Sequence, residues 1–114
     1  MSDLATFVLV CRLDEVSEDE PLSAKVGRET VAVFFAMDQY FVTSDLCSHG
    51  PGYLSEGNVE GFEIECPFHQ GRFDLRTGVP TLPPCTLPVK TWKPHIIDGG
   101  LYIDPDAPSN CEVL

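Results

Sequence analysis

The sequence has few basic residues, few histidines and no long hydrophobic run. Its 114 residues include seven Lys and Arg against eighteen Asp and Glu, which gives a formal net charge of −11. Such an acidic surface disfavours nucleic acid and suits a partner with a basic docking face. Because no stretch of about 18 apolar residues is present, we expect no transmembrane helix. The first residues lack the features of a secretory signal, so we expect a cytoplasmic protein.

A disulfide framework is also not expected. The five cysteines are odd in number, and cytoplasmic thiols are normally kept reduced. Cys47 and Cys66 each stand two or three residues before a histidine, which indicates metal binding. We expect Cys11 and Cys85 to be small buried residues and Cys111 to lie in a loose tail.

A long apolar period of 3.6 residues is missing as well, so we expect little helix and an all-β fold. Segments rich in β-branched and aromatic residues predict antiparallel strands at 6–13, 22–26, 29–36, 40–43, 87–92, 95–97 and 101–103. The corner Met37-Asp38-Gln39 predicts a hairpin, and the acidic run 14–20 predicts a solvated turn. These strands predict an antiparallel β-sandwich base with one core in one domain.

The middle of the chain has a different composition. From residue 45 to about residue 84, glycines and prolines divide the sequence into short segments. We expect a loop-rich insert of this kind to bury little apolar surface and to need another source of stability, such as a metal. The single domain, 1–114, is thus predicted to consist of a base, about 1–44 and 85–114, and an inserted subdomain, about 45–84.

Two motifs in the insert carry ligand chemistry, Cys47-Ser-His49 and Cys66-Pro-Phe-His69. A Rieske-type [2Fe–2S] cluster takes two thiolates on one iron and two imidazoles on the other, and each motif supplies one ligand of each kind. We therefore predict that Cys47 and Cys66 bind one iron and that His49 and His69 bind the other. Structural zinc sites usually have C-x₂₋₄-C and H-x₃₋₅-H spacing, which these motifs match poorly. Zinc and a chance arrangement remain as alternatives.

The residues around these motifs resemble the Rieske-type ferredoxins of bacterial aromatic ring-hydroxylating oxygenase systems. The similar segments are 47–50, 54–57, 65–74 and 77–78, and the resemblance covers about residues 6–104, with 80–88 similar to the family's third loop. It implies the Rieske fold, in which a β-sandwich base carries a loop-rich cluster-binding subdomain with one [2Fe–2S] cluster. It also implies a monomeric electron carrier, not an enzyme, that links an NAD(P)H-dependent flavin reductase to a terminal oxygenase.

Four residues near the ligands suggest a low reduction potential. Respiratory Rieske subunits have a disulfide between the two loops, and the corresponding positions here are Gly52 and Phe68. They also have Ser and Tyr hydroxyls that donate toward sulfur, where this chain has Gly71 and Phe73. Fewer hydrogen bonds to sulfur stabilise the reduced cluster less, so the resemblance implies a potential of about −150 mV.

Electron exchange is expected at the tip formed by His49 and His69, because each imidazole has a second ring nitrogen for outside contacts. The expected apolar docking rim consists of Pro51, Phe68, Leu82 and Pro83, with Arg72 and Arg76 able to bias docking. Asp74 is expected to pair with a nearby arginine, His95 is not expected to be a ligand, and Tyr40 and Trp92 are expected to be core or sheet residues.

Other functions give different expectations. An intact Rieske oxygenase needs a further 2-His-1-carboxylate iron site, and only His95 is left to contribute to one. The small subunit of a nitrite reductase shares the fold but usually lacks these ligands. A zinc-stabilised binding module is the remaining alternative, and visible absorption would distinguish it from an iron–sulfur protein.

Overall fold

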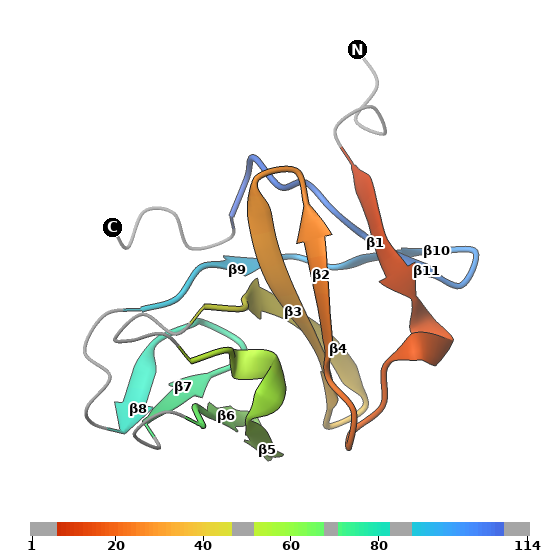
Figure 1. Cartoon of the computed structure of the whole chain (residues 1–114). Coiled ribbons are helices and arrows are strands. Elements are labelled where there is room, and N and C mark those ends of the chain that lie inside the picture. The colour runs from red at the N-terminus through yellow and green to blue at the C-terminus, as the bar shows by residue number, and fades with distance from the viewer. Residues whose placement is uncertain (1–6, 47–51, 68–70, 83–87, 109–114) are drawn as a thin grey trace.

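Three antiparallel sheets make up the computed structural model, which describes residues 7–46, 52–67, 71–82 and 88–108 (Figure 1). The first sheet has the order β1 (Val8–Arg12), β11 (Gly100–Ile103) and β10 (His95–Ile97). The second has the order β2 (Leu22–Val26), β3 (Glu29–Ala36), β4 (Gln39–Ser44) and β9 (Thr91–Trp92). The third has the order β5 (Asn58–Glu60), β6 (Glu63–Glu65), β7 (Arg72–Asp74) and β8 (Pro80–Leu82). Within the described ranges the helices are two 3₁₀ turns, η2 (Leu13–Glu15) and η3 (Leu54–Glu56).

Tight turns set the register of the long strands. Met37 and Asp38 have φ values of 53° and 62°, and they join β3 to β4 with Ala36 paired to Gln39. A two-residue turn with positive φ at both positions matches the right-handed twist of its strands. Asp98 and Gly99, at φ 50° and 77°, join β10 to β11 in the same way. The hairpin predicted at Met37-Asp38-Gln39 is therefore confirmed.

Strand β3 lies between two buried cores because its side chains alternate between the two faces of the sheet. Val31 and Val33 belong to the core of the sandwich base, together with Cys11, Val26, Val42, Trp92, Leu101 and Ile103. Ala32, Phe34 and Ala36 belong to a second core, together with Phe41, Leu54, Ile64, Cys66, Phe73, Leu75 and Val89. The expectation of one core is wrong, because both faces of β3 are covered.

The inserted segment buries more apolar surface than its composition suggests. Each of the three-residue strands β6 and β7 directs its central residue, Ile64 or Phe73, inward with no exposed surface. Leu54 and Leu75 are equally buried in the turns beside these strands. The prediction that the insert buries little apolar surface is therefore wrong, whereas the all-β class and the antiparallel sandwich base are confirmed.

Several smaller expectations can be compared with the structure. Cys11 is buried, Trp92 is buried, and the acidic run 14–20 is exposed apart from Val16. The Trp92 indole N–H donates to the Pro105 carbonyl at 3.2 Å, which fixes the beginning of the segment after β11. Cys85 and Cys111 lie outside the described residues.

None of the helices in the described ranges is long and apolar enough to cross a membrane.

Candidate metal centre

Two connections of the insert carry the four predicted ligands. Cys47 and His49 fall between β4 and η3, and Cys66 and His69 fall between β6 and β7. The structure describes Cys66, whereas the other three lie outside the described residues. Cys66 has no exposed surface and belongs to the core of the insert. A ligand at this position would have an apolar surrounding on the protein side.

The first loop is closed at its base by pairing between its two ends. Leu46 and Tyr53 form an antiparallel bridge. The Leu54 N–H donates to the Asp45 carbonyl at 2.7 Å, and the Asp45 N–H donates to the Thr30 carbonyl on β3 at 2.9 Å. The two ends of the segment that carries Cys47 and His49 therefore meet at one place, beside β3 of the second sheet.

The second loop is closed in the same manner by a hairpin. Glu65 pairs with Arg72 in the β6–β7 register. Beyond that pair, the Cys66 N–H donates to the Gly71 carbonyl at 2.7 Å. The segment with Cys66 and His69 is thus the tip of a hairpin whose strands are held by Ile64 and Phe73 in the core.

Close backbone packing brings the bases of these two loops together. A β-carbon at Gly57 would overlap the Glu65 carbonyl oxygen, so only glycine fits at this position between η3 and β5. Leu54 of η3 and Cys66 share the same core. Two loops with paired bases on one core suit a group held between them, and the donor set of two thiols and two imidazoles suits a Rieske-type cluster.

Exposed apolar residues lie at the loop bases. Leu46 and Tyr53 are 48% and 45% exposed, and Leu82, opposite Arg72 at the end of β8, is 45% exposed. Leu82 was predicted to be a docking residue, and its exposure agrees with that role. The pair Leu46 and Tyr53 was not predicted, because only the bridge between them reveals that they lie together. Pro51, Phe68 and Pro83 lie outside the described residues.

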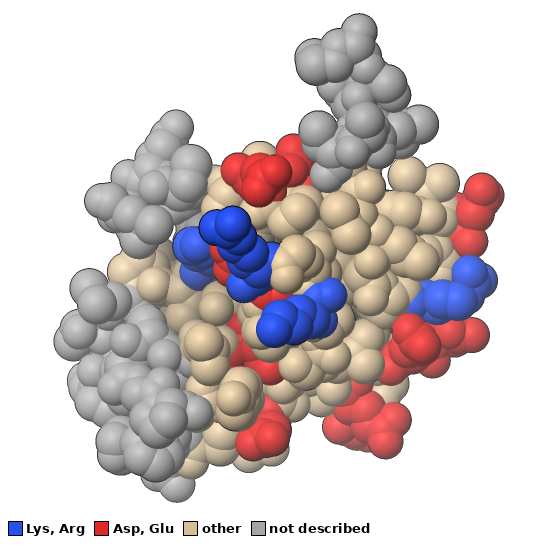
Figure 2. Space-filling model, turned by 45° about the horizontal axis from the view of Figure 1, so that its top comes forward, with Lys and Arg blue, Asp and Glu red and all other residues tan. Residues whose placement is uncertain are grey.

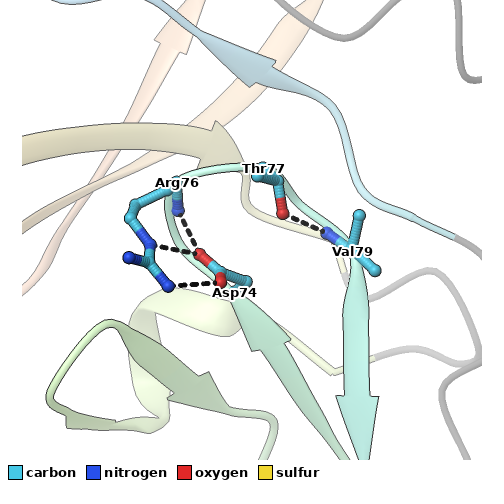
Figure 3. Close-up of polar contacts among 4 residues, drawn as sticks. All are labelled: Asp74, Arg76, Thr77 and Val79. Atoms are coloured by element: carbon cyan, nitrogen blue, oxygen red, sulfur yellow. Dashed lines mark hydrogen bonds and ion pairs between the residues drawn. The ribbon is translucent and has the colours of Figure 1, made fainter.

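The β7–β8 turn contains the predicted pair of Asp74 with an arginine, which is Arg76 (Figure 3). The Arg76 side chain donates from Nε to Oδ1 at 3.1 Å and from Nη2 to Oδ2 at 2.9 Å, and its backbone N–H also donates to Oδ1 at 2.8 Å. The side-chain hydrogen bond from Arg76 is the largest cause that holds the pKa of Asp74 below its usual value. The guanidinium also lies 4.2 Å above the Phe62 ring. These contacts hold the β7–β8 turn against Phe62.

Arg72 is paired with carboxylates of the neighbouring strands. Its Nη1 lies 2.7 Å from Glu60 Oε1 and 3.3 Å from Glu63 Oε1, and hydrogen bonds to these two carboxylates raise its pKa. Both arginines that were expected to bias docking therefore contact carboxylates of their own chain, and their effect on docking stays a prediction. His95 lies on β10 and stacks on Phe7, with ring centroids 4.3 Å apart.

These observations describe a β-sandwich with an inserted two-loop metal centre, and comparison with known families identifies the class. A model of the Rieske [2Fe-2S] domain matches residues 6–93. The chain belongs to this family, and its cofactor is one Rieske-type [2Fe–2S] cluster rather than a structural zinc ion.

Particular relatives narrow the class to ferredoxins. The chain is 46% identical over 92 residues to the anthranilate 1,2-dioxygenase ferredoxin subunit of Burkholderia cepacia, covering 81% of this chain and 85% of that protein. Its structure resembles a ferredoxin of Sphingomonas yanoikuyae B1, with a TM-score of 0.82, 38% identity, and coverage of 85% and 96%. It also resembles a chain in the complex of reduced oxygenase and oxidized ferredoxin in carbazole 1,9a-dioxygenase, with a TM-score of 0.79, 35% identity, and coverage of 87% and 93%. The protein is a Rieske-type ferredoxin, an electron carrier and not itself an enzyme.

Proposed function

We propose that this ferredoxin delivers single electrons to the terminal oxygenase of an aromatic-ring dioxygenase system, and that Cys47, His49, Cys66 and His69 hold its cluster. The observation that carries the proposal is the sequence similarity, over most of the chain, to ferredoxin components of dioxygenase systems. The partner follows from the similarity to a structure that contains a ferredoxin with its oxygenase. The electron donor is proposed to be an NAD(P)H-dependent flavin reductase.

The residues have distinct parts in this function. Cys47, His49, Cys66 and His69 would hold the cluster through two thiolates and two imidazoles, and the cluster would supply one-electron redox chemistry. The paired loop bases orient the ligands, and the apolar core around Cys66 keeps water from the protein side of the site. Exposed Leu46, Tyr53 and Leu82 supply apolar surface for a docked partner. Electron exchange itself is proposed at His49 and His69.

The domain organisation, oligomeric state and location of the protein are also proposals. We propose a single Rieske domain over 1–114, with a base of about 1–44 and 85–114 and a cluster-binding subdomain of about 45–84. The third sheet, from Asn58 to Leu82, falls inside that subdomain. We further propose that the protein acts as a monomer in the cytoplasm.

Spectroscopy of ligand variants tests the ligand assignment. Protein purified without oxygen should show visible charge-transfer bands and, after reduction, the electron paramagnetic resonance spectrum of a Rieske centre. Substitution of any one of the four proposed ligands by Ala should remove both signals. His95→Ala, which changes the remaining histidine, should keep them. Retention of the spectrum in Cys66→Ala or His49→Ala would contradict the assignment.

Electron delivery is tested separately from cluster binding. With NADH, a flavin reductase and an aromatic-ring oxygenase, product should form only when the ferredoxin is present. Leu82→Asp should lower the rate at limiting ferredoxin and leave the visible spectrum unchanged, because it places charge on the exposed apolar surface and replaces no proposed ligand. Val79→Asp is the matched control, since Val79 is also 45% exposed but lies at the other end of the β7–β8 hairpin. Equal rates for both variants would contradict docking at this surface.

A further inference from the structure

Asp45 is a buried carboxylate that follows β4 and stands two positions before Cys47. It is 1% exposed. Its Oδ2 accepts a hydrogen bond from the Ser23 hydroxyl on β2 at 2.7 Å, and its Oδ1 accepts one from the Ser55 N–H in η3 at 2.8 Å. The carboxylate therefore connects β2, the edge strand of the second sheet, with η3, the turn that follows the first loop.

The backbone of Asp45 strengthens the same connection. Its N–H donates to the Thr30 carbonyl on β3 at 2.9 Å, and its carbonyl accepts from the Leu54 N–H at 2.7 Å. Both ends of the loop that carries Cys47 and His49 are thus tied to one residue. Only the side chain joins that residue to β2, so loss of the carboxylate would leave the loop base attached through backbone hydrogen bonds alone.

Ordinary core packing does not account for a carboxylate in this place. Transfer of a carboxylate from water to a buried site is unfavourable unless hydrogen bonds compensate, and an apolar side chain often serves packing equally well. The strand register places Ser23 beside Ala32 and Ala32 beside Thr43, so these three residues share one face of the second sheet. The small Ala32 lies between the strands that carry Ser23 and Thr43, and Asp45 comes two positions after Thr43 on the same face.

We propose that Asp45 is a positioning residue of the metal centre, whose carboxylate holds the base of the first ligand loop in the geometry that the cluster requires. This role rests on the proposed ligand set, because it acts through Cys47 and His49. Groups that orient metal ligands typically change metal retention by about 10–100-fold when they are removed.

Three variants separate geometry from charge and from general stability. Asp45→Ala removes both side-chain hydrogen bonds. Asp45→Asn removes the charge but preserves the geometry, since its amide oxygen can accept from the Ser55 N–H and its amide nitrogen can donate to the Ser23 hydroxyl. Ser23→Ala removes one contact at an exposed position of β2. Asp74→Ala is the control, because Asp74 is another hydrogen-bonded carboxylate of the insert, in the β7–β8 turn.

The measurements are made on the full-length protein loaded with its cluster. Iron loss to an external chelator is followed at a temperature where circular dichroism shows each variant to be folded, and the reduced proteins are compared by electron paramagnetic resonance. Asp45→Ala should lose iron about 10–100-fold faster than the parent protein and show shifted g values. Ser23→Ala should lose iron faster than the parent but slower than Asp45→Ala. Asp45→Asn should restore the g values of the parent protein and most of its iron retention, and Asp74→Ala should match the parent.

The proposal is overturned if Asp45→Ala keeps the parent's iron loss and g values, or if Asp74→Ala loses iron as fast as Asp45→Ala does. It is also overturned if Asp45→Asn is as defective as Asp45→Ala, since charge rather than geometry would then matter. If Asp45→Ala does not fold, Ser23→Ala and Asp45→Asn decide: the first must accelerate iron loss and the second must not. An incorrect ligand set would appear differently, as a cluster retained when Cys47 or His49 is replaced.

Discussion

Cys11 shows how a residue outside the metal centre can make stability depend on pH. Burial, with a smaller contribution from the Glu15 carboxylate, raises the pKa of this thiol from 9.0 to about 11. Between these values the unfolded chain loses the proton and the folded chain keeps it, so the free energy of unfolding must fall as pH rises. The stability of the parent protein should therefore decrease more steeply from pH 9 to pH 11 than that of Cys11→Ala, as measured by urea unfolding. Parallel pH profiles for the two proteins would contradict a buried, protonated thiol.

Phe73 is the residue through which the predicted low potential can be tested. It has no exposed surface and shares a core with Cys66. Phe73→Tyr adds a hydroxyl at the position that the sequence resemblance matches to a tyrosine of respiratory Rieske subunits. A hydrogen bond to sulfur stabilises the reduced cluster, so the midpoint potential should rise. Protein-film voltammetry measures this directly, and Phe62→Tyr, at a partly buried position of the same core, is the control that should leave the potential unchanged. A parent potential above about +100 mV would contradict the low end of the Rieske range.

At the scale of elements, the sequence predicts the strands of the base well and those of the insert poorly. Strands β2, β3 and β10 have the predicted bounds. Alternation of apolar and polar residues marks β2, and β-branched or aromatic residues mark β3 and β10. Strands β5 to β8 have three residues each, too few to show a period of two, and β5 and β6 have glutamates beside a single inward residue. The unbroken apolar run from Val31 to Ala36 indicates in retrospect that both faces of β3 are covered.

The sequence likewise predicts some features of the metal centre and not others. The proposed ligand motifs are local, so spacing alone predicts them. The Asp45 network is not local, because its partners Ser23 and Ser55 lie 22 and 10 residues away. The bridge between Leu46 and Tyr53 likewise depends on loop closure, and no sequence pattern indicates it.

The two cores should make different contributions to the metal centre. Ile64 and Ile103 have no exposed surface, and each belongs to a different core. Ile64→Val and Ile103→Val remove the same methylene and should each lower the free energy of unfolding by about 0.5–1.5 kcal/mol. Only Ile64→Val should accelerate iron loss to a chelator, because its core supports both loops. Equal acceleration by the two variants would show that the cores are coupled throughout the fold.

At the scale of the whole molecule, the net charge of −11 should govern encounters with small ionic oxidants. Acidic side chains stand at many places around the face shown in Figure 2, with the basic ones gathered mainly near its middle. Oxidation of the reduced protein by hexaammineruthenium(III), a cation, should slow as salt rises from about 0.01 M to about 1 M, because screening shortens the Debye length from about 30 Å to about 3 Å. Oxidation by the anion ferricyanide should accelerate over the same range. Stopped-flow absorbance measures both rates, and a salt dependence of the same sign for the two would contradict long-range control by the protein's charge.

Strand β3 also determines how the molecule can be divided. Because β3 contributes residues to both cores, a chain cut into two pieces would leave at least one piece with an incomplete core. An excised segment 45–84 would leave Ile64 and Phe73 facing solvent where Ala32 and Phe34 now lie. Transfer of the electron-carrying unit into another scaffold would therefore require β2, β3 and β4 as well as the two loops. The other face of β3 would then need the remaining strands of the sandwich to cover Val31 and Val33.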